Sequence, residues 1–357
     1  MGCGSSTATN ASQATSKPSG GNRGGDKPIV TLTGVTGYLG SQVCRLFLED
    51  GGFRVRGTVR DKNNEAKVAP IREAFGELFN QLELVEADLM DEASLISAIQ
   101  GSKYVVHLAS PFFMSQDENV LIPPAVNGTK AVMKACQQAG VSRCVITSSL
   151  ASVQHLAEAD KPADRTFNES HWSNPDRPEG MSAYPKSKVL AEKAAWDFQA
   201  ALPDDQKFEL VTICPGFIMG PPLRKESFTS GGWMKSLMEG KMTEISSEHM
   251  SGVDVRDTAS AHLLGIKNPA AANRRFILCH SSPSFQDYAA PVAEKYRPLG
   301  WPITETLKPA NPDEYVSLFD NAASRELGVV YTDWSKTMVD MADKMVELGT
   351  VVKPEAQ

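Results

Sequence analysis

Two short segments of the chain carry side chains whose chemistry suits proton transfer to or from an oxygen. Tyr184 and Lys188 are four residues apart, so on a helix they share one face. An ammonium group beside a phenol favours the phenolate and lowers its pKa, which suits the tyrosine to general acid–base work. Ser148 and Ser149 end an apolar run upstream, and either hydroxyl could hold a carbonyl oxygen next to Tyr184. The spacing alone does not choose between the serines, nor does it exclude an ordinary tyrosine–lysine pair on a helix surface.

A glycine-rich turn near the start of the chain is typical of dinucleotide sites. It follows the apolar run 29–33 and opens a helical pattern. In such turns the first glycine permits a tight bend, and the last lets helix and strand pack closely. Between them the backbone approaches a pyrophosphate, which faces the helix N-terminus. The spacing is G-x-x-G-x-x-G, and its strand–helix context favours a dinucleotide over a plain glycine loop. The candidate cofactor contacts here are Gly34, Thr36, Gly37, Tyr38, Leu39 and Gly40.

The residues after the second expected strand indicate which dinucleotide is bound. An acidic residue there binds the ribose hydroxyls of NAD, whereas arginine accommodates the 2′-phosphate of NADP. Arg60 comes directly after the strand, Asp61 follows it, and Lys67 lies one to two helical turns beyond. This order favours NADP(H), although solvated roles for both cations are the alternative. Asp88 and Leu89 end the third strand, where they could contact adenine or simply cap the strand end.

The rest of the pattern alternates apolar strands with helices, which predicts a parallel sheet covered on both faces. We therefore expect an α/β fold, a Rossmann-type doubly wound sheet with ligands at the carboxyl ends of its strands. The expected strands span 29–33, 54–59, 82–86, 104–108, 143–147, 210–214 and, later, 276–279. The expected helices span 38–49, 65–79, 125–139, 181–200 and 338–348, with a strand end and helix over 253–265.

The chain divides by composition into a tail and two lobes. Residues 1–26 almost lack large apolar side chains and are expected to be a disordered tail, because they cannot offset their ordering entropy. Residues 27–220, with a later segment at about 251–282, are expected to form the dinucleotide-binding domain. The regular pattern fades after Gly220, so 221–250 and 283–357 are expected to form a smaller, discontinuous substrate lobe.

Composition excludes several classes of protein. A net charge of −7 with interspersed signs argues against nucleic-acid binding. The six cysteines and six histidines show no paired metal-ligand spacing, so we expect no metal and a cytoplasmic protein with reduced thiols. No stretch is long and apolar enough to span a membrane. Gly2 and Cys3 fit a myristoylation and palmitoylation pattern, which would tether the chain, although a chance run of small residues is the alternative.

Taken together, these motifs resemble the extended short-chain dehydrogenase/reductase family. Within it, the chain looks similar to the dihydroflavonol 4-reductase group, which includes aldehyde, ketone and cinnamoyl-CoA reductases. The supporting segments are 30–40, 57–61, 86–89, 106–111, 147–149, 184–188 and 215–221, within a resemblance that covers nearly all of 28–350. The resemblance implies Ser149 as the catalytic serine, Tyr184 as the acid and Lys188 as its support. It implies further cofactor contacts at Leu108, Ala109, Ser110, Tyr184, Lys188, Pro215, Gly216, Phe217 and Ile218.

Two departures from the family pattern bear on the substrate. Cinnamoyl-CoA reductases carry Asn-Trp-Tyr-Cys-Tyr before the catalytic lysine, whereas this chain has Gly-Met-Ser-Ala-Tyr over 180–184. Flavonoid reductases carry an asparagine where this chain has Gln154. Both favour an aldehyde or ketone reductase of broad range over a plant-specific one. Methionines and aromatic residues between 217 and 242 suggest an adaptable pocket wall, with ordinary core as the alternative.

The sequence therefore predicts an NADPH-dependent reductase that converts a carbonyl to an alcohol, with Tyr184 as general acid. A 3β-hydroxysteroid dehydrogenase or a sugar-nucleotide epimerase or dehydratase would share the catalytic group, but would typically carry an acidic residue where Arg60 stands. A non-catalytic NADP-binding sensor is the third possibility, though such proteins tend to lose the tyrosine or the lysine. We expect a small-molecule carbonyl substrate and a monomer or homodimer.

Overall fold

A seven-stranded parallel sheet forms the centre of the computed structural model, which describes residues 1–2, 27–109 and 117–354. The strand order is β10-β7-β5-β4-β1-β2-β3, so the order reverses between β1 and β4. In doubly wound sheets, ligands bind at the carboxyl ends of the strands at this point. The strands of the sheet are β1 (Ile29–Thr33), β2 (Arg54–Val59), β3 (Leu82–Glu86), β4 (Tyr104–His107), β5 (Arg143–Thr147), β7 (Glu209–Pro215) and β10 (Arg274–Leu278).

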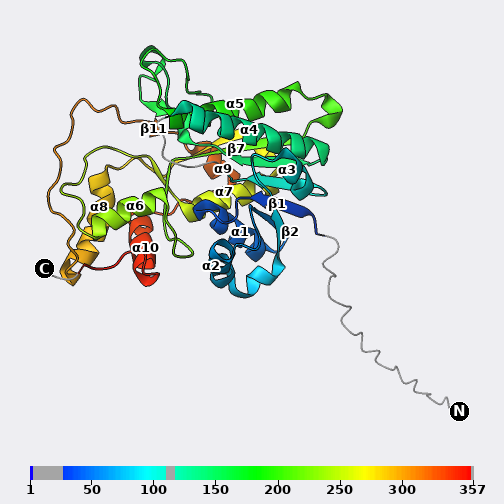
Figure 1. Cartoon of the computed structure of the whole chain (residues 1–357), viewed down its shortest axis with the longest axis horizontal. Helices are drawn as coiled ribbons and strands as arrows, with labels where there is room; N and C mark the ends of the chain where they lie inside the picture. The colour runs from blue at the N-terminus through cyan, green and yellow to red at the C-terminus, as the bar shows by residue number, and fades with distance from the viewer. Residues whose placement is uncertain (3–26, 110–116, 355–357) are drawn as a thin grey trace.

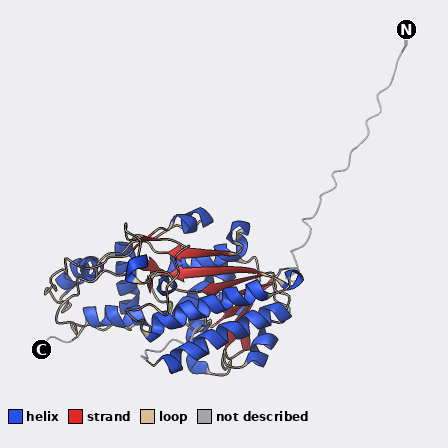
Figure 2. Cartoon of the chain, turned by 90° about the horizontal axis from the view of Figure 1, so that it is seen from above, coloured by secondary structure: helices blue, strands red, loops and turns tan. Residues whose placement is uncertain are grey.

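Helices cover both faces of the sheet, as the predicted fold requires (Figures 1 and 2). On one face, a core that includes Phe47, Ile71 and Phe276 packs under α1 (Tyr38–Asp50), α2 (Glu65–Phe75), α7 (Val255–Lys267) and α9 (Ala322–Leu327). On the other, a core that includes Ile99 and Met133 packs under α3 (Glu92–Ile99), α4 (Glu118–Gln138) and α5 (Ala183–Ala201). Strands with apolar side chains on both faces account for this arrangement.

A second, methionine-rich core lies at one end of the molecule, where Figure 1 shows three helices grouped together. These helices are α6 (Thr229–Met238), α8 (Phe285–Tyr296) and α10 (Trp334–Glu347). Met234, Val292 and Met341 are fully buried in it. Two small parallel pairs flank the main sheet: β8 (Phe217–Met219) with β9 (Gly252–Asp254), and β6 (Thr166–Phe167) with β11 (Leu318–Phe319). The separate core agrees with the expected smaller lobe, whose boundaries and role stay a prediction.

The structure corrects several expected elements. The helix expected over 125–139 begins at Glu118, because Asp117 caps it and Leu121 is buried, even though Pro123 and Pro124 lie inside. The helix expected over 65–79 ends at Phe75 and continues as a 3₁₀ turn. Four helices in the described part of the chain were not expected at all: α3, α6, α8 and α9. Short 3₁₀ turns also occur at 150–152, 158–160, 204–206, 269–271 and 297–299.

Within the described part of the chain, no helix is long and apolar enough to cross a membrane. The same residues contain no group of three or more His, Cys, Asp or Glu side chains that could hold a metal ion. The five cysteines in these ranges are buried and form no disulfide. Cys3, Ser110 and the tail over 3–26 lie outside the described residues, so the predictions made for them stay predictions.

Candidate active site

The glycine turn lies at the carboxyl end of β1 and is packed so tightly that side chains would collide. Gly34 has a φ of +72°, and a Cβ there would lie 2.9 Å from that of Ala109, at the end of β4. A Cβ on Gly40 would lie 2.1 Å from the carbonyl oxygen of Gly34. The turn therefore requires glycine at both positions, for bending and for close packing respectively.

The N-terminus of α1 suits an anion. Gly37 is the N-cap and offers no capping side chain, and the first turn contains no acidic residue. The amide groups at such a terminus carry partial positive charge and readily bind phosphate. The turn and helix thus fit the pyrophosphate of a dinucleotide, and Thr36, Tyr38 and Leu39 lie at this terminus as predicted.

The end of β2 carries the residues expected to select the cofactor. Arg60 and Lys67 are both exposed. Oδ1 of Asp61 accepts a hydrogen bond from the backbone amide of Asn63 at 2.8 Å and so takes part in a local turn. This arrangement leaves cationic side chains to meet a ligand at the strand end, which fits a 2′-phosphate better than a ribose hydroxyl.

Asp88 and Leu89 lie beyond the end of β3. Asp88 is exposed, and its Oδ1 accepts from the amide of Met90 at 2.9 Å, the geometry of a turn-forming residue. Leu89 packs next to Gly128 on α4. The capping role considered for Asp88 is therefore present, and a contact with adenine stays a prediction.

The end of β4 is fixed by hydrogen bonds to β1. Thr33 Oγ1 accepts from the amides of Leu108 and Ala109, both at 3.1 Å. The same hydroxyl lies 2.9 Å from Nδ1 of buried His107. Burial, followed by the charge of Lys188, lowers the pKa of His107 to about 4. His107 is thus a neutral, packed residue at the end of β4.

Tyr184 and Lys188 lie on α5, with Tyr184 near the N-terminus of the helix and 37% exposed. Lys188 Nζ lies 5.7 Å from the centre of the Tyr184 ring, so the two side chains share one face as predicted. Helix α5 packs against the 3₁₀ turn 150–152 that follows Ser149. The structure therefore brings the tyrosine–lysine face and the serine segment to the same edge of the sheet.

The two serines at the end of β5 differ in their contacts. Ser148 is buried, and its Oγ donates to Glu192 Oε2 at 2.5 Å. Ser149 is half-buried, and its Oγ accepts from the amide of Ala151 at 3.1 Å, which leaves the hydroxyl proton able to point toward a ligand. The geometry favours Ser149, the serine that the family resemblance implies.

Residues 215–218 continue from β7 into β8 beside the end of the sheet. The amide of Gly216 donates to Leu278 O at 2.9 Å, and a Cβ on Gly216 would lie 2.4 Å from Ser251 O. Pro215 is buried, whereas Phe217 and Ile218 are half-buried. Tyr38 O–H reaches across from α1 to Gly220 O at 2.8 Å, and joins this segment to the glycine turn.

Sequence reasoning missed a cation–carboxylate pair beside the glycine turn. Arg224 Nη2 donates to Thr36 O at 2.5 Å and to Glu226 Oε2 at 2.7 Å. Burial raises the pKa of Glu226 to about 7, against the opposing charges of Arg224 and Lys67. No signal in the sequence around 220–230 links it to a turn nearly two hundred residues earlier.

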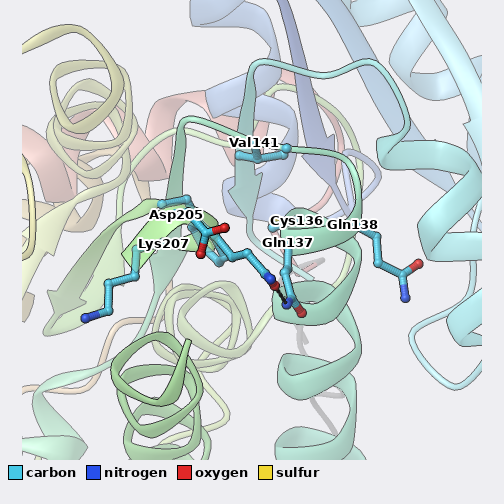
Figure 3. Close-up of a pocket in the computed structure, with 9 residues that line it drawn as sticks. Cys136, Gln137, Gln138, Val141, Asp205 and Lys207 are labelled. Atoms are coloured by element: carbon cyan, nitrogen blue, oxygen red, sulfur yellow. Dashed lines mark hydrogen bonds between the residues drawn. The ribbon is translucent and has the colours of Figure 1, made fainter. Parts of the chain in front are cut away.

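A surface pocket with a volume of about 460 Å³ lies elsewhere on the molecule (Figure 3). Its lining includes Cys136 and Gln137 from the end of α4, and Asp205 and Lys207 from the loop before β7. These residues lie at the amino ends of β5 and β7, opposite the edge that carries Ser149. Because ligands of doubly wound sheets bind at the carboxyl edge, this pocket is not the candidate active site.

Comparison with known proteins identifies the family. The profile of the 3-beta hydroxysteroid dehydrogenase/isomerase family matches residues 31–294. The chain belongs to this family. The predicted extended short-chain dehydrogenase/reductase type and the predicted oxidoreductase class are thereby confirmed.

Known proteins that are similar to this chain align with most of its length. Tetraketide alpha-pyrone reductase 1 of Arabidopsis thaliana is 31% identical over 329 residues, which cover 90% of this chain and 97% of the relative. Dihydroflavonol 4-reductase of Zea mays is 31% identical over 90% of this chain and 88% of the relative. The structure is similar to yeast methylglyoxal/isovaleraldehyde reductase complexed with NADPH, with a TM-score of 0.78, 28% identity, and coverage of 91% and 100%.

Proposed function

We propose that the protein reduces a small aldehyde or ketone to an alcohol with NADPH, and that Tyr184 is the general acid. The observation that carries the proposal is the meeting of three features at one edge of the sheet. These are the close-packed glycine turn, the Tyr184–Lys188 face of α5, and a serine segment in which Ser149 keeps a hydroxyl for a ligand. The relatives named above are reductases, and the yeast structure contains NADPH, which supports the same reaction class.

In the proposed reaction, some residues of the site bind the substrate and others transfer the proton. NADPH, when bound, supplies the hydride that is added to the carbonyl carbon. Ser149 donates a hydrogen bond to the carbonyl oxygen and holds it beside Tyr184. Tyr184 gives its phenolic proton to that oxygen as negative charge develops there, and the alcohol results. The Lys188 ammonium stabilises the phenolate left behind.

The cofactor proposal rests on charge at the end of β2. Arg60 and Lys67 present two cations, and one carboxylate oxygen of Asp61 belongs to the turn at Asn63. A phosphate on the adenosine ribose would be paired with these cations. The steroid dehydrogenase and epimerase alternatives would favour NAD and an acidic residue at position 60, so Arg60 argues for the reductase.

The experiment follows the loss of NADPH absorbance with methylglyoxal, isovaleraldehyde, a diketone, a flavanonol and a 3-ketosteroid, with NADH in parallel. We expect turnover with NADPH, and a fall of about 100-fold or more in kcat for Tyr184→Phe, the typical contribution of general acid catalysis. Tyr104→Phe is the matched control, because Tyr104 lies at the amino end of β4, away from the site.

Each outcome decides between the candidate functions. Turnover of an aldehyde or ketone that is lost in Tyr184→Phe and kept in Tyr104→Phe supports the proposal. Turnover of the ketosteroid alone would replace it with the steroid reaction for which the family is named. NADPH binding without turnover of any compound would favour the sensor. Equal activity of Tyr184→Phe and the unmodified protein would refute the role of Tyr184.

We also propose that the methionine-rich lobe forms part of the substrate wall. Phe217 of β8, which follows β7 of the main sheet, packs edge-on against Phe285 of α8, with 6.4 Å between the ring centres. Trp233 of α6 lies 5.4 Å from the same Phe285 ring. These half-buried aromatic side chains continue from the predicted cofactor segment into the lobe. Substrate range that changes in Trp233→Ala with an unchanged Kd for NADPH would support this role, and an unchanged range would remove it.

A further inference from the structure

A buried glutamate lies on the same helix face as the proposed acid. Glu192 is on α5, four residues beyond Lys188 and eight beyond Tyr184, so the three side chains follow one stripe of the helix. The side chain of Glu192 is 1% exposed. The sequence around it, Leu190-Ala-Glu192, is typical of an ordinary amphipathic helix. A buried carboxylate, however, needs partners for its charge.

Apart from Trp196 of the same helix, whose Nε1 donates to Glu192 Oε1 at 3.4 Å, those partners come from three neighbouring strands of the sheet and the turn after β5. Glu192 Oε2 accepts from Ser148 Oγ at 2.5 Å, at the end of β5. Glu192 Oε1 accepts from Thr212 Oγ1 of β7 at 2.8 Å and from Arg275 Nε of β10 at 2.7 Å. One carboxylate therefore ties the helix of the proposed acid to β5, β7 and β10.

Arg275, the arginine in this cluster, has several further partners of its own. Arg275 Nη1 donates to the carbonyl oxygens of Glu169 and His171 at 2.7 and 2.8 Å. Its guanidinium lies over the ring of Trp172, 3.6 Å from the ring centre. The charges of Arg275 and Glu192 compensate one another in the interior. Burial acts to raise the pKa of Glu192, but Arg275 and the serine hydroxyls outweigh it, so the pKa is lowered and the carboxylate stays charged.

The contacts of Glu192 enclose Ser149 from both sides. Ser148 precedes it, and Ser152 closes the 3₁₀ turn that follows it. The Ser152 hydroxyl lies 2.5 Å from Glu192 Oε2 and 2.7 Å from the carbonyl oxygen of Ser149. The segment that presents Ser149 is therefore fixed at both ends to one atom on α5.

We propose that Glu192 is a positioning residue, which sets the placement of Ser149 relative to Tyr184 and Lys188 through Ser148 and Ser152. The inference rests on the proposed function, because it concerns the same reaction. Glu192 touches neither substrate nor cofactor. It acts by holding the serine segment and the acid's helix in one geometry, and displacement of about 1 Å between reacting groups can cost roughly 100-fold in rate.

The test compares substitutions that each remove one side-chain partner of the same carboxylate. Ser152→Ala also removes the contact of Ser152 with the carbonyl oxygen of Ser149, so Ser148→Ala is the cleaner of the two serine variants. Ser148→Ala and Ser152→Ala remove contacts on either side of Ser149. Thr212→Val removes a contact of similar burial that leads to β7 and away from Ser149. For each variant we would measure kcat and KM with the fastest carbonyl of the panel, the Kd for NADPH, and Tm.

We expect kcat to fall roughly tenfold to a hundredfold in Ser148→Ala and Ser152→Ala, with little change in the Kd for NADPH. Thr212→Val should lower Tm comparably and leave kcat within about twofold, since its contact does not reach Ser149. Glu192→Gln should show the larger kcat loss, and these serine variants keep the test valid where Glu192→Gln does not fold. Equal kcat losses in Ser148→Ala, Ser152→Ala and Thr212→Val, in proportion to the loss of Tm, would reduce Glu192 to a structural role and overturn the proposal.

The variant Tyr184→Phe, measured in the same assays, distinguishes a failure of the proposed function from a failure of the positioning role of Glu192. Activity of the unmodified protein that is lost in Tyr184→Phe upholds the proposed function, whatever the serine variants show. Activity that survives Tyr184→Phe refutes the proposed function and with it the geometry that Glu192 would serve. Activity that depends on Tyr184 but not on Ser148 or Ser152 refutes the positioning role alone.

Discussion

At the scale of single residues, the cofactor preference depends on one exposed arginine. Arg60 follows β2 directly, where a 2′-phosphate would lie. A charge-assisted hydrogen bond is worth about 1.5–3 kcal/mol, so Arg60→Ala should raise the Kd for NADPH roughly tenfold to a hundredfold and change the Kd for NADH little. Fluorescence titration of both cofactors measures this. Arg54→Ala, at the exposed amino end of the same strand, is the control. Equal losses for both cofactors would show that Arg60 does not read the phosphate.

The raised pKa of Glu226 predicts that the stability of the protein depends on pH. Burial raises its pKa from 4.5 to about 7, which corresponds to at most about 3 kcal/mol. Because the folded state holds this proton more tightly than the unfolded state, the stabilisation is complete below pH 4.5 and is lost as pH rises through 7. Glu226→Gln carries no titrating proton, so its Tm should fall less than that of the unmodified protein between pH 5 and 8.

Other groups titrate in the same range, so the comparison between the two proteins is what isolates Glu226. Burial raises the pKa of Asp257 to about 6, while burial lowers that of His262 to about 4. Both contributions are present in each protein and cancel in the difference. A Tm difference that stays constant from pH 5 to 8 would contradict the raised pKa of Glu226.

At the scale of elements, the glycine turn makes a steric prediction. Gly40→Ala places a Cβ 2.1 Å from a backbone oxygen, and either strand β1 or helix α1 must move. Forced overpacking costs about 1–3 kcal/mol, so the free energy of unfolding should drop and NADPH binding should weaken. Gly232→Ala is the matched control, because this helical glycine in α6 has nothing within 4 Å and should gain up to about 1 kcal/mol. Urea denaturation measures both; an unchanged Gly40→Ala would disprove the close packing.

The elements that sequence predicted well share a physical cause. Strands of a parallel sheet are buried on both faces, so β1 and β5 contain short apolar runs, and the sequence located the ends of both strands. Helix α3 was missed although Asp91 caps it and Leu95, Ala98 and Ile99 are spaced for one buried face. Helices α6 and α8 belong to the lobe, where packing against other helices decides the conformation more than local pattern does.

The candidate site was predictable only where its residues carry local motifs. Tyr184, Lys188 and the glycine turn each have a recognisable spacing, and the structure places them at one edge of the sheet. Glu192 has no such signal, because its partners outside α5 lie 20 to 83 residues away along the chain. The single available hint was its position one turn beyond Lys188 on a face that had to meet the sheet. Arg224 had no hint at all, since its contact with Thr36 depends on the tertiary fold.

At the scale of the whole molecule, one aspartate connects the two cores. Asp254 follows Val253 of the sheet-side core, and its side chain is fully buried. Its Oδ2 accepts from Thr337 Oγ1 of α10 at 2.7 Å, next to the methionines of the second core. Arg256 pairs with Asp254 and with Asp340 of α10, both at 2.7 Å. The lobe is therefore attached to the sheet through a buried, charged contact as well as through apolar packing.

Removal of one partner from such a pair should be costly, because the other charge is left without compensation. Asp254→Asn should lower the free energy of unfolding by about 3 kcal/mol. Asp340→Asn alters the more exposed of the two carboxylates that pair with Arg256, and it should lower the free energy of unfolding by no more than about 1 kcal/mol. Trp233, Trp301 and Trp334 all contact the methionine-rich core. Tryptophan fluorescence therefore reports mainly on the unfolding of the lobe, whereas circular dichroism reports on the unfolding of all helices.

The two signals then report whether Asp254 couples the cores. In the unmodified protein the urea transitions should coincide, because the lobe and the sheet unfold together. In Asp254→Asn the fluorescence transition should move to lower urea than the dichroism transition, since the lobe loses its buried attachment first. Coincident transitions in Asp254→Asn, or equal losses in Asp254→Asn and Asp340→Asn, would show that apolar packing alone joins the lobe to the sheet. The substrate wall would then depend on the methionine core and not on this aspartate for its place beside Tyr184.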